Sequence, residues 1–555
     1  MRALKLLSVV NVLAWMIPAT AAAQTGSSMT SDVTTVRQAV DQIIARERTE
    51  VAVIQRYKPV VETYVQDIRP DAEMGLVPVK DHYFLSQGEL SKHIDSMLED
   101  KKTTKFVFNP FTHLSGSSNN TNVPDDFLQM VYVDVDGFDR QHYEFRYLGR
   151  EYLGEVRCVV FDVMPLPKSG KGRFNGRIWA EDQGFTIVRF NGSFESSESE
   201  GKHDLQFDSW RMNLQPDLWL PALIYSQESR NKNRSDSSIS SRAQTRLWGY
   251  SLANPDHSAD FNQVALDQSP VKSSQDYSPV EAEQKWRQRA EANVLDRLYG
   301  IGLIAPPGEV DKVLETVVNN LEVTNNLDID VHCRVLLIST LESFSIGHTI
   351  VVSRGLIDVL PDEPSLAAVL AQELAEVMMT KPSTDQWGFN NTKKVTASEA
   401  LSHFSFKNTP EEVEKCNKKA LEILEHSPYK EQLGKAALFL KQLSADSKAL
   451  PSLIDARLGN DVALSSALST IGPPLQRENL NQVTALPLGS RVKVNPWDDR
   501  VELLKAKPVF LISAREKMPF GVMPFLLSLT RYQDPKAIGK PGTSTQATPE
   551  AGAHK

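Results

Sequence analysis

Leu128-Gln-Met-Val-Tyr-Val-Asp-Val135 and Glu155-Val-Arg-Cys-Val-Val-Phe-Asp-Val163 are two of several segments between residues 127 and 253 in which apolar and polar residues alternate. A period of two is typical of strands that bury one face. Turn-forming residues such as Asp136-Gly137 and Lys168-Ser-Gly-Lys-Gly172 separate the segments. Sequential strands joined by short turns predict a curved antiparallel sheet in this region.

Helical patterns flank the predicted sheet on both sides. Residues 31–66 carry apolar residues at helical spacing, and Ser31 or Asp32 is expected to cap that helix. Residues 254–283 are rich in Pro, Ser, Asp and Gln, which is typical of a linker. Helices predominate after it, interrupted by short strand patterns around residues 331–338 and 349–352. The sequence therefore predicts an α+β protein.

The N-terminus has the layout of a secretory signal peptide. Arg2 and Lys5 precede a mostly apolar stretch from Leu6 to Ile17, and small residues lead up to Ala23. This layout predicts that the chain is exported to the periplasm or the extracellular space and cleaved near Ala23. The alternative is that this stretch stays as an N-terminal membrane anchor.

These patterns give a map of five parts. The parts are a signal peptide (1–23), a helix plus antiparallel β domain (31–253), a linker (254–283), a mainly helical domain with a small β-sheet and a C-terminal extension (284–534), and a disordered tail (535–555).

Composition excludes several classes of protein. Of the 555 residues 41% are hydrophobic and 24% charged, which is ordinary for a globular protein and excludes wholesale disorder. The net charge of −9 argues against a nucleic-acid partner, because affinity for phosphate needs clustered Lys and Arg. The three cysteines, Cys158, Cys333 and Cys416, are too sparse for a disulfide framework. Sparse cysteine in an exported chain fits a protein of the bacterial envelope.

Residues 340–380 read TLESFSIGHTIVVSRGLIDVLPDEPSLAAVLAQELAEVMMT. This stretch resembles the zinc metallopeptidases of the HtpX and BepA type, in which a strand, the motif I-x-V-x-R-G-L, an acidic turn and L-A-A-V-L-A precede H-E-x-x-H. The resemblance extends over roughly residues 285–460. It implies a metallopeptidase-like domain whose cofactor is Zn²⁺.

The zinc motif of that family is degenerate in this chain. Two His residues at i and i+4 on one helix face bind Zn²⁺, and the Glu between them is the general base. Here those positions are Gln372, Glu373 and Glu376, so only the base remains. The resemblance places the third metal ligand at Val413, which cannot bind a metal, although a shift of one residue would bring Glu412 or Glu414 there. We therefore expect no bound zinc and no hydrolysis.

Three interpretations of Gln372, Glu373 and Glu376 remain open. In the first they form the polar face of an amphipathic helix whose apolar stripe includes Leu370 and Leu374. In the second they belong to a vestigial cleft that binds a peptide without cutting it. In the third they form a site for a hard cation or an unusual active site.

Residues 127–253 are similar, more weakly, to the periplasmic lipoprotein-carrier fold, which holds acyl chains in a half-barrel. The pattern of long strands with aromatic inner positions carries this resemblance, and a generic antiparallel sheet packed on the first helix is the alternative. The following aromatic residues would fill a core in one case and line a lipid cleft in the other: Trp179, Phe185, Phe190, Phe194, Trp210, Trp219 and Trp248.

Three functions follow from these resemblances. The first is an exported, inactive metallopeptidase homologue that binds polypeptide or envelope components. Peptidases of this class bind substrate along an edge strand, which the resemblance places at Thr349, Ile350, Val351 and Val352. The second is an active zinc-dependent endopeptidase with an atypical site, so whether the chain is an enzyme stays open. The third is a lipid or lipoprotein carrier that acts through the N-terminal sheet.

Overall fold

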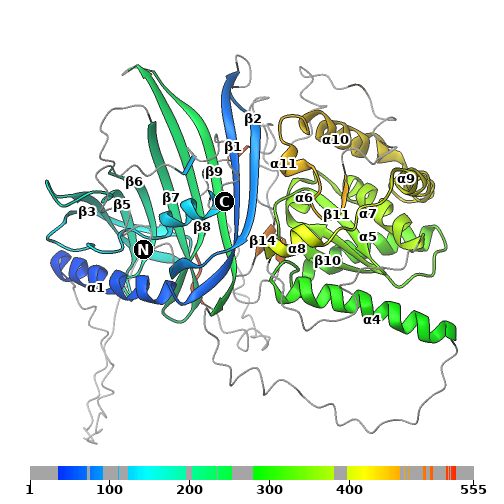
Figure 1. Cartoon of the computed structure of the whole chain (residues 1–555), viewed down its shortest axis with the longest axis horizontal. Helices are drawn as coiled ribbons and strands as arrows, with labels where there is room; N and C mark the ends of the chain where they lie inside the picture. The colour runs from blue at the N-terminus through cyan, green and yellow to red at the C-terminus, as the bar shows by residue number, and fades with distance from the viewer. Residues whose placement is uncertain are drawn as a thin grey trace, which may run out of the picture.

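The fold is taken from a computed structural model of the chain (Figure 1). The structure describes residues 35–71, 75–91, 110–111, 123–195, 203–233, 236–252, 279–379 and 397–462. It also describes short pieces at 468, 474, 492–494, 501–503, 521–522, 524 and 527–532. The predicted signal peptide and tail, and residues 254–278 of the predicted linker, lie outside these ranges. The rest of that linker is helical, because α4 begins at Pro279.

A nine-stranded antiparallel sheet forms the N-terminal part of the molecule, with strand order β2-β1-β9-β8-β7-β6-β5-β4-β3. The predicted meander is confirmed, since β3 to β9 follow one another in both the sequence and the sheet. Its strands are β3 (Tyr143–Leu153), β4 (Val156–Pro165), β5 (Phe174–Glu181), β6 (Ile187–Phe194), β7 (His203–Gln215), β8 (Leu218–Asn233) and β9 (Asp236–Leu252).

The expected helix over residues 31–66 is only partly correct. Helix α1 spans Val36–Ile54, and Thr35, rather than Ser31 or Asp32, caps it by accepting a hydrogen bond from the Gln38 backbone N. Tyr57–Asp71 is strand β1, which pairs with β9 and with β2 (Gly75–Gln87). Apolar residues of β1 continue the helical spacing of α1 by chance, so the periodicity hid the boundary between the two elements.

The strand expected at residues 128–135 is absent. The chain there forms helix α3 (Val123–Leu128) and the short 3₁₀-helix η2 (Gln129–Val131) instead. Tyr132 and Val133 are consecutive and both fully buried. Burial of both sides of the segment, rather than alternation, explains why its composition is so apolar.

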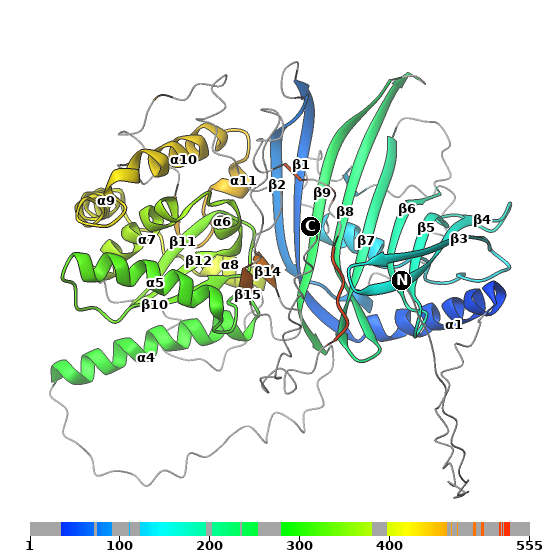
Figure 2. The ribbon, with the colours of Figure 1, turned by 180° about the vertical axis from the view of Figure 1, so that it is seen from behind.

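Different parts of the chain pack on the two faces of the large sheet. Helix α1 packs on one face, called here the inner face, in a cluster that includes Ile43, Val65 and Phe161. The opposite, outer face contacts the C-terminal part through β1, β2 and β9, where Val60, Tyr83 and Trp248 belong to the same cluster as the C-terminal core. Figures 1 and 2 show the two parts side by side, with α1 running across one end of the strands.

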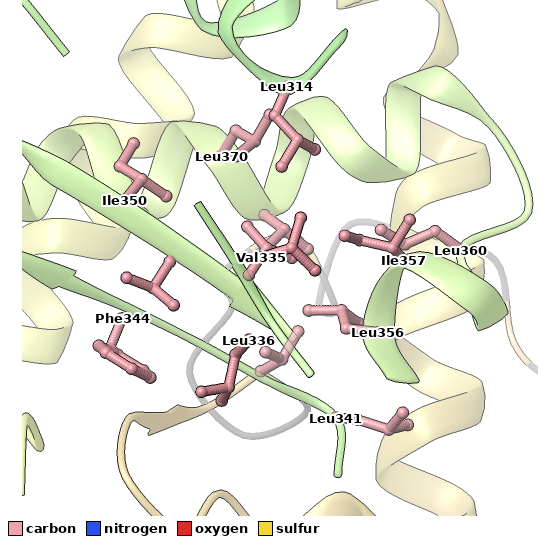
Figure 3. Packing of buried hydrophobic residues seen from close by; sticks show 14 of the residues in the cluster. Leu314, Val335, Leu336, Leu341, Phe344, Ile350, Leu356, Ile357, Leu360 and Leu370 are labelled. Atoms are coloured by element: carbon pink, nitrogen blue, oxygen red, sulfur yellow. The ribbon is translucent and has the colours of Figure 1, made fainter. Parts of the chain in front are cut away.

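The C-terminal part is a four-stranded sheet of order β10-β12-β11-β13 with helices around it. Its apolar core lies between this sheet and helices α5, α6 and α7 (Figure 3). Together with the large sheet it confirms the α+β class. The strands are β10 (His332–Leu336), β11 (Glu342–Ile346), β12 (Thr349–Ser353) and β13 (Asn460–Asp461). The helices are α4 (Pro279–Gly300), α5 (Glu309–Thr324), α6 (Arg354–Val359), α7 (Glu363–Met378), α8 (Ala397–His403), α9 (Pro410–Glu425), α10 (Leu433–Asp446) and α11 (Pro451–Ile454).

Two further strands, β14 (Val492–Val494) and β15 (Val501–Leu503), form a separate hairpin. Among the residues that the structure describes, no helix is both long and apolar enough to cross a membrane.

Candidate functional site

Helix α7 carries the residues that the sequence aligned with a zinc motif. The Asp362 carboxylate caps its first turn by accepting a hydrogen bond from the Ser365 backbone N at 3.0 Å. Pro364 stands in that first turn, where its missing N–H costs nothing. The helix then places Gln372, Glu373 and Glu376 towards its C-terminal end.

Glu373 is buried, with 2% of its surface exposed. Its Oε1 accepts a hydrogen bond from Ser343 Oγ at 2.7 Å, and its Oε2 has no hydrogen-bond partner among the described residues. Burial, and secondarily the charge of Glu376, raise the pKa of Glu373 well above its ordinary value. Because Glu373 is buried, the interpretation of a solvent-facing polar surface is wrong for it.

Glu376 and Gln372 are half-buried on the same helix. Glu376 Oε2 accepts a hydrogen bond from Asn460 Nδ2 at 3.1 Å, and Asn460 Oδ1 accepts one from the Asn408 backbone N at 2.8 Å. Asn460 belongs to β13, so a residue 84 positions away in the sequence holds the Glu376 side chain.

The chain leading into β13 lies along β11, the strand that carries Ser343. Glu342 Oε2 accepts hydrogen bonds from the backbone N of Arg457, Leu458 and Gly459. A Cβ at Gly459 would lie 2.2 Å from the Ser343 carbonyl oxygen, so only glycine permits this approach. Sequence reasoning missed Ser343 and Asn460, because their contacts join segments that are far apart in the chain.

The predicted peptide-binding edge strand is not an edge. Strand β12 contains Thr349, Ile350, Val351 and Val352, and it pairs with β10 on one side and β11 on the other. An added strand needs unpaired backbone groups, and β12 offers no free side. Residues 349–353 are all buried, which is typical of a central strand.

Val413 lies on α9, which packs against α7. Cys416 Sγ is 3.9 Å from Met379 Sδ at the C-terminal end of α7, and Tyr429, just after α9, donates a hydrogen bond to Glu363 at the N-terminal end. The two helices are therefore antiparallel. Convergence of Val413 with Gln372 and Glu376 stays a prediction.

Within the described residues, no three His, Cys, Asp or Glu side chains gather closely enough to hold a metal ion. What the α7 site presents is one buried carboxyl with a raised pKa, Glu373, and one carboxyl held by an amide, Glu376. A raised pKa favours the protonated form of the Glu373 carboxyl, and that form cannot act as a general base.

A second candidate site lies under α1 on the inner face of the large sheet. Arg211 of β7 donates hydrogen bonds from both terminal nitrogens to the Glu47 carboxylate at 2.7 and 2.6 Å, and neither side chain is more than 1% exposed. Glu50, one turn further along α1, is also buried and pairs with Arg46 at 2.8 Å. Burial raises the Glu50 pKa to about 7, against the opposing effect of Arg211.

The hydrogen bonding of this charged group is incomplete. Glu50 Oε2 and Arg211 Nε are buried and have no hydrogen-bond partner among the described residues. Each such orphaned group costs about 1–3 kcal/mol or more. Helix α1 thus packs on an apolar face through a buried polar group whose hydrogen bonding is incomplete.

Polar contacts also hold α1 at its rim. Arg140 pairs with Asp41 at 2.7 Å and Arg48 with Asp139 at 3.2 Å, and all of these side chains except Asp139 are exposed. A surface pocket of about 370 Å³ opens where α1 meets the turn between β5 and β6. Its lining residues are Gln42, Ala45, Arg46, Thr49, Gln183, Gly184 and Phe185.

The aromatic residues that the sequence singled out divide between the two faces. Phe190 and Phe194 join Phe174 and Phe207 in a cluster on the inner face, with ring centroids 5.0–6.3 Å apart. Phe185 packs against the same inner cluster. Trp179, Trp210 and Trp219 form a separate cluster on the outer face, and Trp248 contacts the C-terminal core. Only the phenylalanines are placed to meet an inner-face ligand.

Comparison with known proteins gives matches to solved structures of low sequence identity. No family model matches the chain, and no curated protein matches it. A putative outer membrane lipoprotein-sorting protein domain from Vibrio parahaemolyticus is 10% identical, with a TM-score of 0.20, over 40% of this chain and 95% of that one. A DUF1329 family protein from Desulfovibrio piger is 11% identical, with a TM-score of 0.21, over 40% of this chain and 98% of that one. At these scores the likeness assigns neither a fold nor a function.

Proposed function

We propose that the nine-stranded sheet carries an acyl chain, free or attached to a lipoprotein, on its inner face and that α1 is the lid of this site. The observation that carries the proposal is the presence of two buried acidic residues, Glu47 and Glu50, in the contact between α1 and a mostly apolar face. A helix that only filled a core would place apolar residues at both positions.

Buried charges make the closed position of α1 less stable than an apolar contact would. Taking an ion pair out of water has a desolvation cost that its attraction often fails to recover. Elements that must move have low local stability. Ion pairs hold α1 at its rim, and the Glu47–Arg211 pair holds it inside. Because acidic residues interrupt the apolar stripe of α1, the helix exposes less continuous apolar surface when it leaves the sheet.

The surface beneath the lid suits a hydrocarbon. The four phenylalanines of the inner cluster meet mostly at steep angles, and they pack with the aliphatic residues Val163, Ile178 and Leu205. An acyl chain gains about 0.8 kcal/mol for each CH₂ that it buries in such a place. The predicted export of the chain places this proposed carrier in the bacterial envelope.

We further propose that the C-terminal part does not hydrolyse peptides. The burial and raised pKa of Glu373 and the contact of Glu376 with Asn460 support this. The part would then serve as a fixed support for the β1–β2 side of the sheet, where it contacts Tyr83 and Trp248.

Lipid binding is tested on the purified full chain. Mass spectrometry of an organic extract should show co-purifying lipid, and cis-parinaric acid should bind with enhanced fluorescence. The variant Glu47→Gln leaves Arg211 without its charge partner and should bind the probe faster and more extensively. The matched control Asp41→Asn breaks only the exposed rim pair with Arg140 and should change binding little.

A folded wild type and a folded Glu47→Gln variant that both lack extractable lipid and bind no probe would overturn the carrier proposal. Circular dichroism on both proteins shows whether they are folded.

A further inference from the structure

A short segment near the C-terminus, residues 527–532, lies on the outer face of the large sheet. Figure 2 shows it as a red trace against the strands. Leu527 and Leu529 pack on the outer-face cluster, while Ser528 and Thr530 are exposed. This alternation is that of an extended chain with every second side chain towards the sheet. The segment is thus seated in the way that a bound peptide would be.

Leu529 is the most deeply buried residue of the segment, with 2% of its surface exposed. Its backbone N donates a hydrogen bond to the Leu153 carbonyl at 3.2 Å, and its carbonyl accepts one from the Glu155 N at 2.9 Å. Gly154 lies between these two partners with φ +68°, and a Cβ there would come within 2.6 Å of the Leu529 N and O. The turn between β3 and β4 is therefore shaped for the backbone of an extended chain.

Arg531 adds an ion pair to the contact between the segment and the sheet. Its Nη2 donates a hydrogen bond to Glu181 Oε2 at 2.9 Å and lies 4.0 Å from Asp182 Oδ1. Glu181 is only 3% exposed, so the arginine reaches a carboxylate that is fixed in the sheet. The Tyr532 backbone N then donates to Asn213 Oδ1 at 2.7 Å.

The sheet beneath the segment is rigid. The Arg189 guanidinium stacks between the Trp179 and Trp210 rings, 4.3 and 4.4 Å from their centroids, and pairs with Asp208 through two hydrogen bonds. A surface held in this way needs little reordering when a peptide binds, so less of the interaction energy is lost.

We propose that this outer-face site, formed by Leu153, Gly154, Trp179, Glu181 and Asn213, recognises an extended polypeptide with the pattern Leu-x-Leu-x-Arg. The chain fills the site with its own residues 527–531, and a partner polypeptide with that pattern binds by exchange. The Glu181 carboxylate calls for a basic side chain in the partner, and the sequence of the seated segment gives the rest of the pattern. The site is on the opposite face from the proposed lipid site and does not depend on it.

Exchange is possible because the segment is held locally. Between the described residues, its backbone hydrogen-bonds Leu153 and Glu155 through Leu529, and Asn213 through Tyr532. A tether makes the chain's own segment a strong competitor through its high effective concentration. A variant that weakens only the resident segment should therefore reveal binding of an added peptide.

The test uses a fluorescein-labelled peptide that copies residues 525–533 and the full-length chain. Fluorescence anisotropy should show weak binding to the wild type. Binding to Leu529→Ala should be at least tenfold tighter, since the resident segment then occupies the site less. Arg531→Ala is a milder variant with the same expected direction. A control peptide with Leu529→Asp and Arg531→Glu should not bind.

A matched pair of glycine variants, each combined with Leu529→Ala, locates the binding site. Gly154→Ala places a methyl against the peptide backbone and should abolish binding. Gly149→Ala also changes a glycine with positive φ in the same region, but a Cβ there has open space and binding should persist. Equal binding by the two glycine variants would overturn the proposal, as would no peptide binding to folded Leu529→Ala and Arg531→Ala proteins.

Discussion

Glu62 of β1 accepts two hydrogen bonds from Ser339, one from its backbone N at 2.6 Å and one from its Oγ at 2.7 Å. The same carboxylate accepts hydrogen bonds from Tyr83 and from Arg246 at 2.8 Å. Glu62 is 2% exposed. The large sheet and the C-terminal part therefore share a buried polar contact in which one carboxylate has four donors.

Replacing Glu62 with alanine should destabilise the whole molecule. The change leaves Arg246 buried without its charge partner, and breaking a buried pair in this way costs about 3–5 kcal/mol. Urea unfolding followed by circular dichroism measures the loss. The control Arg287→Ala breaks an exposed pair within α4 and should cost about 0.5 kcal/mol or less. Similar losses for the two variants would show that the Glu62 contact is not formed.

Cutting the chain between the two parts should leave them associated. The predicted linker should be the first site of limited proteolysis, as its composition favours an exposed chain. The fragments should still elute together in size-exclusion chromatography, because Val60, Tyr83 and Trp248 share one apolar cluster with the C-terminal core. Fragments that separate without denaturant would contradict the interface.

A zinc site should be recoverable on α7. In Gln372→His with Glu376→His, two imidazoles stand one helical turn apart, and Asn460→Glu adds a carboxylate beside residue 376. Isothermal titration should show zinc binding for this triple variant and none for the parent. The alternative triple variant with Val413→Glu tests the position that the family resemblance predicts for the third ligand. If a folded Asn460 variant binds no zinc, the three side chains do not converge.

The stability of the protein should depend on pH through Glu50 of α1. Its pKa in the folded protein is raised to about 7, so folding favours the protonated form. The stability that this proton contributes is fully present below about pH 4.5 and is lost as the pH rises through 7. The loss approaches about 1.4 kcal/mol for each pH unit between these values. Glu50→Gln cannot ionise and should lack this part of the pH dependence.

Urea unfolding of the wild type and Glu50→Gln at pH 5 and pH 8 measures the difference. The groups around Glu50 are Arg46, Glu47, Glu181 and Arg211, and all four are unchanged in the variant. The variant should gain stability relative to the wild type as the pH rises. A constant difference between the two proteins would mean that Glu50 titrates normally in the folded state.

The sequence predicted those parts of the fold that depend on local patterns. Turn residues and alternation predicted the antiparallel sheet between residues 127 and 253, including the segment that forms β4. The predicted cap of the first helix, Ser31 or Asp32, was wrong, because Thr35 caps it. Strand β1 was missed because its apolar residues continued the spacing of α1. The role of β12 was predicted wrongly, since a run of apolar residues shows that a strand is buried but not which strands lie beside it.

The candidate site was predicted less well than the fold. The motif comparison found Gln372, Glu373 and Glu376, but the partners of these residues come from β11 and β13. No sequence spacing links Ser343 to Glu373 or Asn460 to Glu376. The buried charge pair between Glu47 and Arg211 is likewise separated by 164 positions, so only the tertiary structure brings it together.

The seated segment at residues 527–532 also affects how the molecule is made. During synthesis the nine strands leave the ribosome well before Leu529 does, so the tryptophan cluster on the outer face has no cover during that interval. Exposed apolar surface in a nascent or translocating chain attracts chaperones and promotes aggregation. The N-terminal sheet therefore completes its apolar packing only after the C-terminal segment has been synthesised. A product truncated before Leu529 would keep an exposed apolar surface on the outer face.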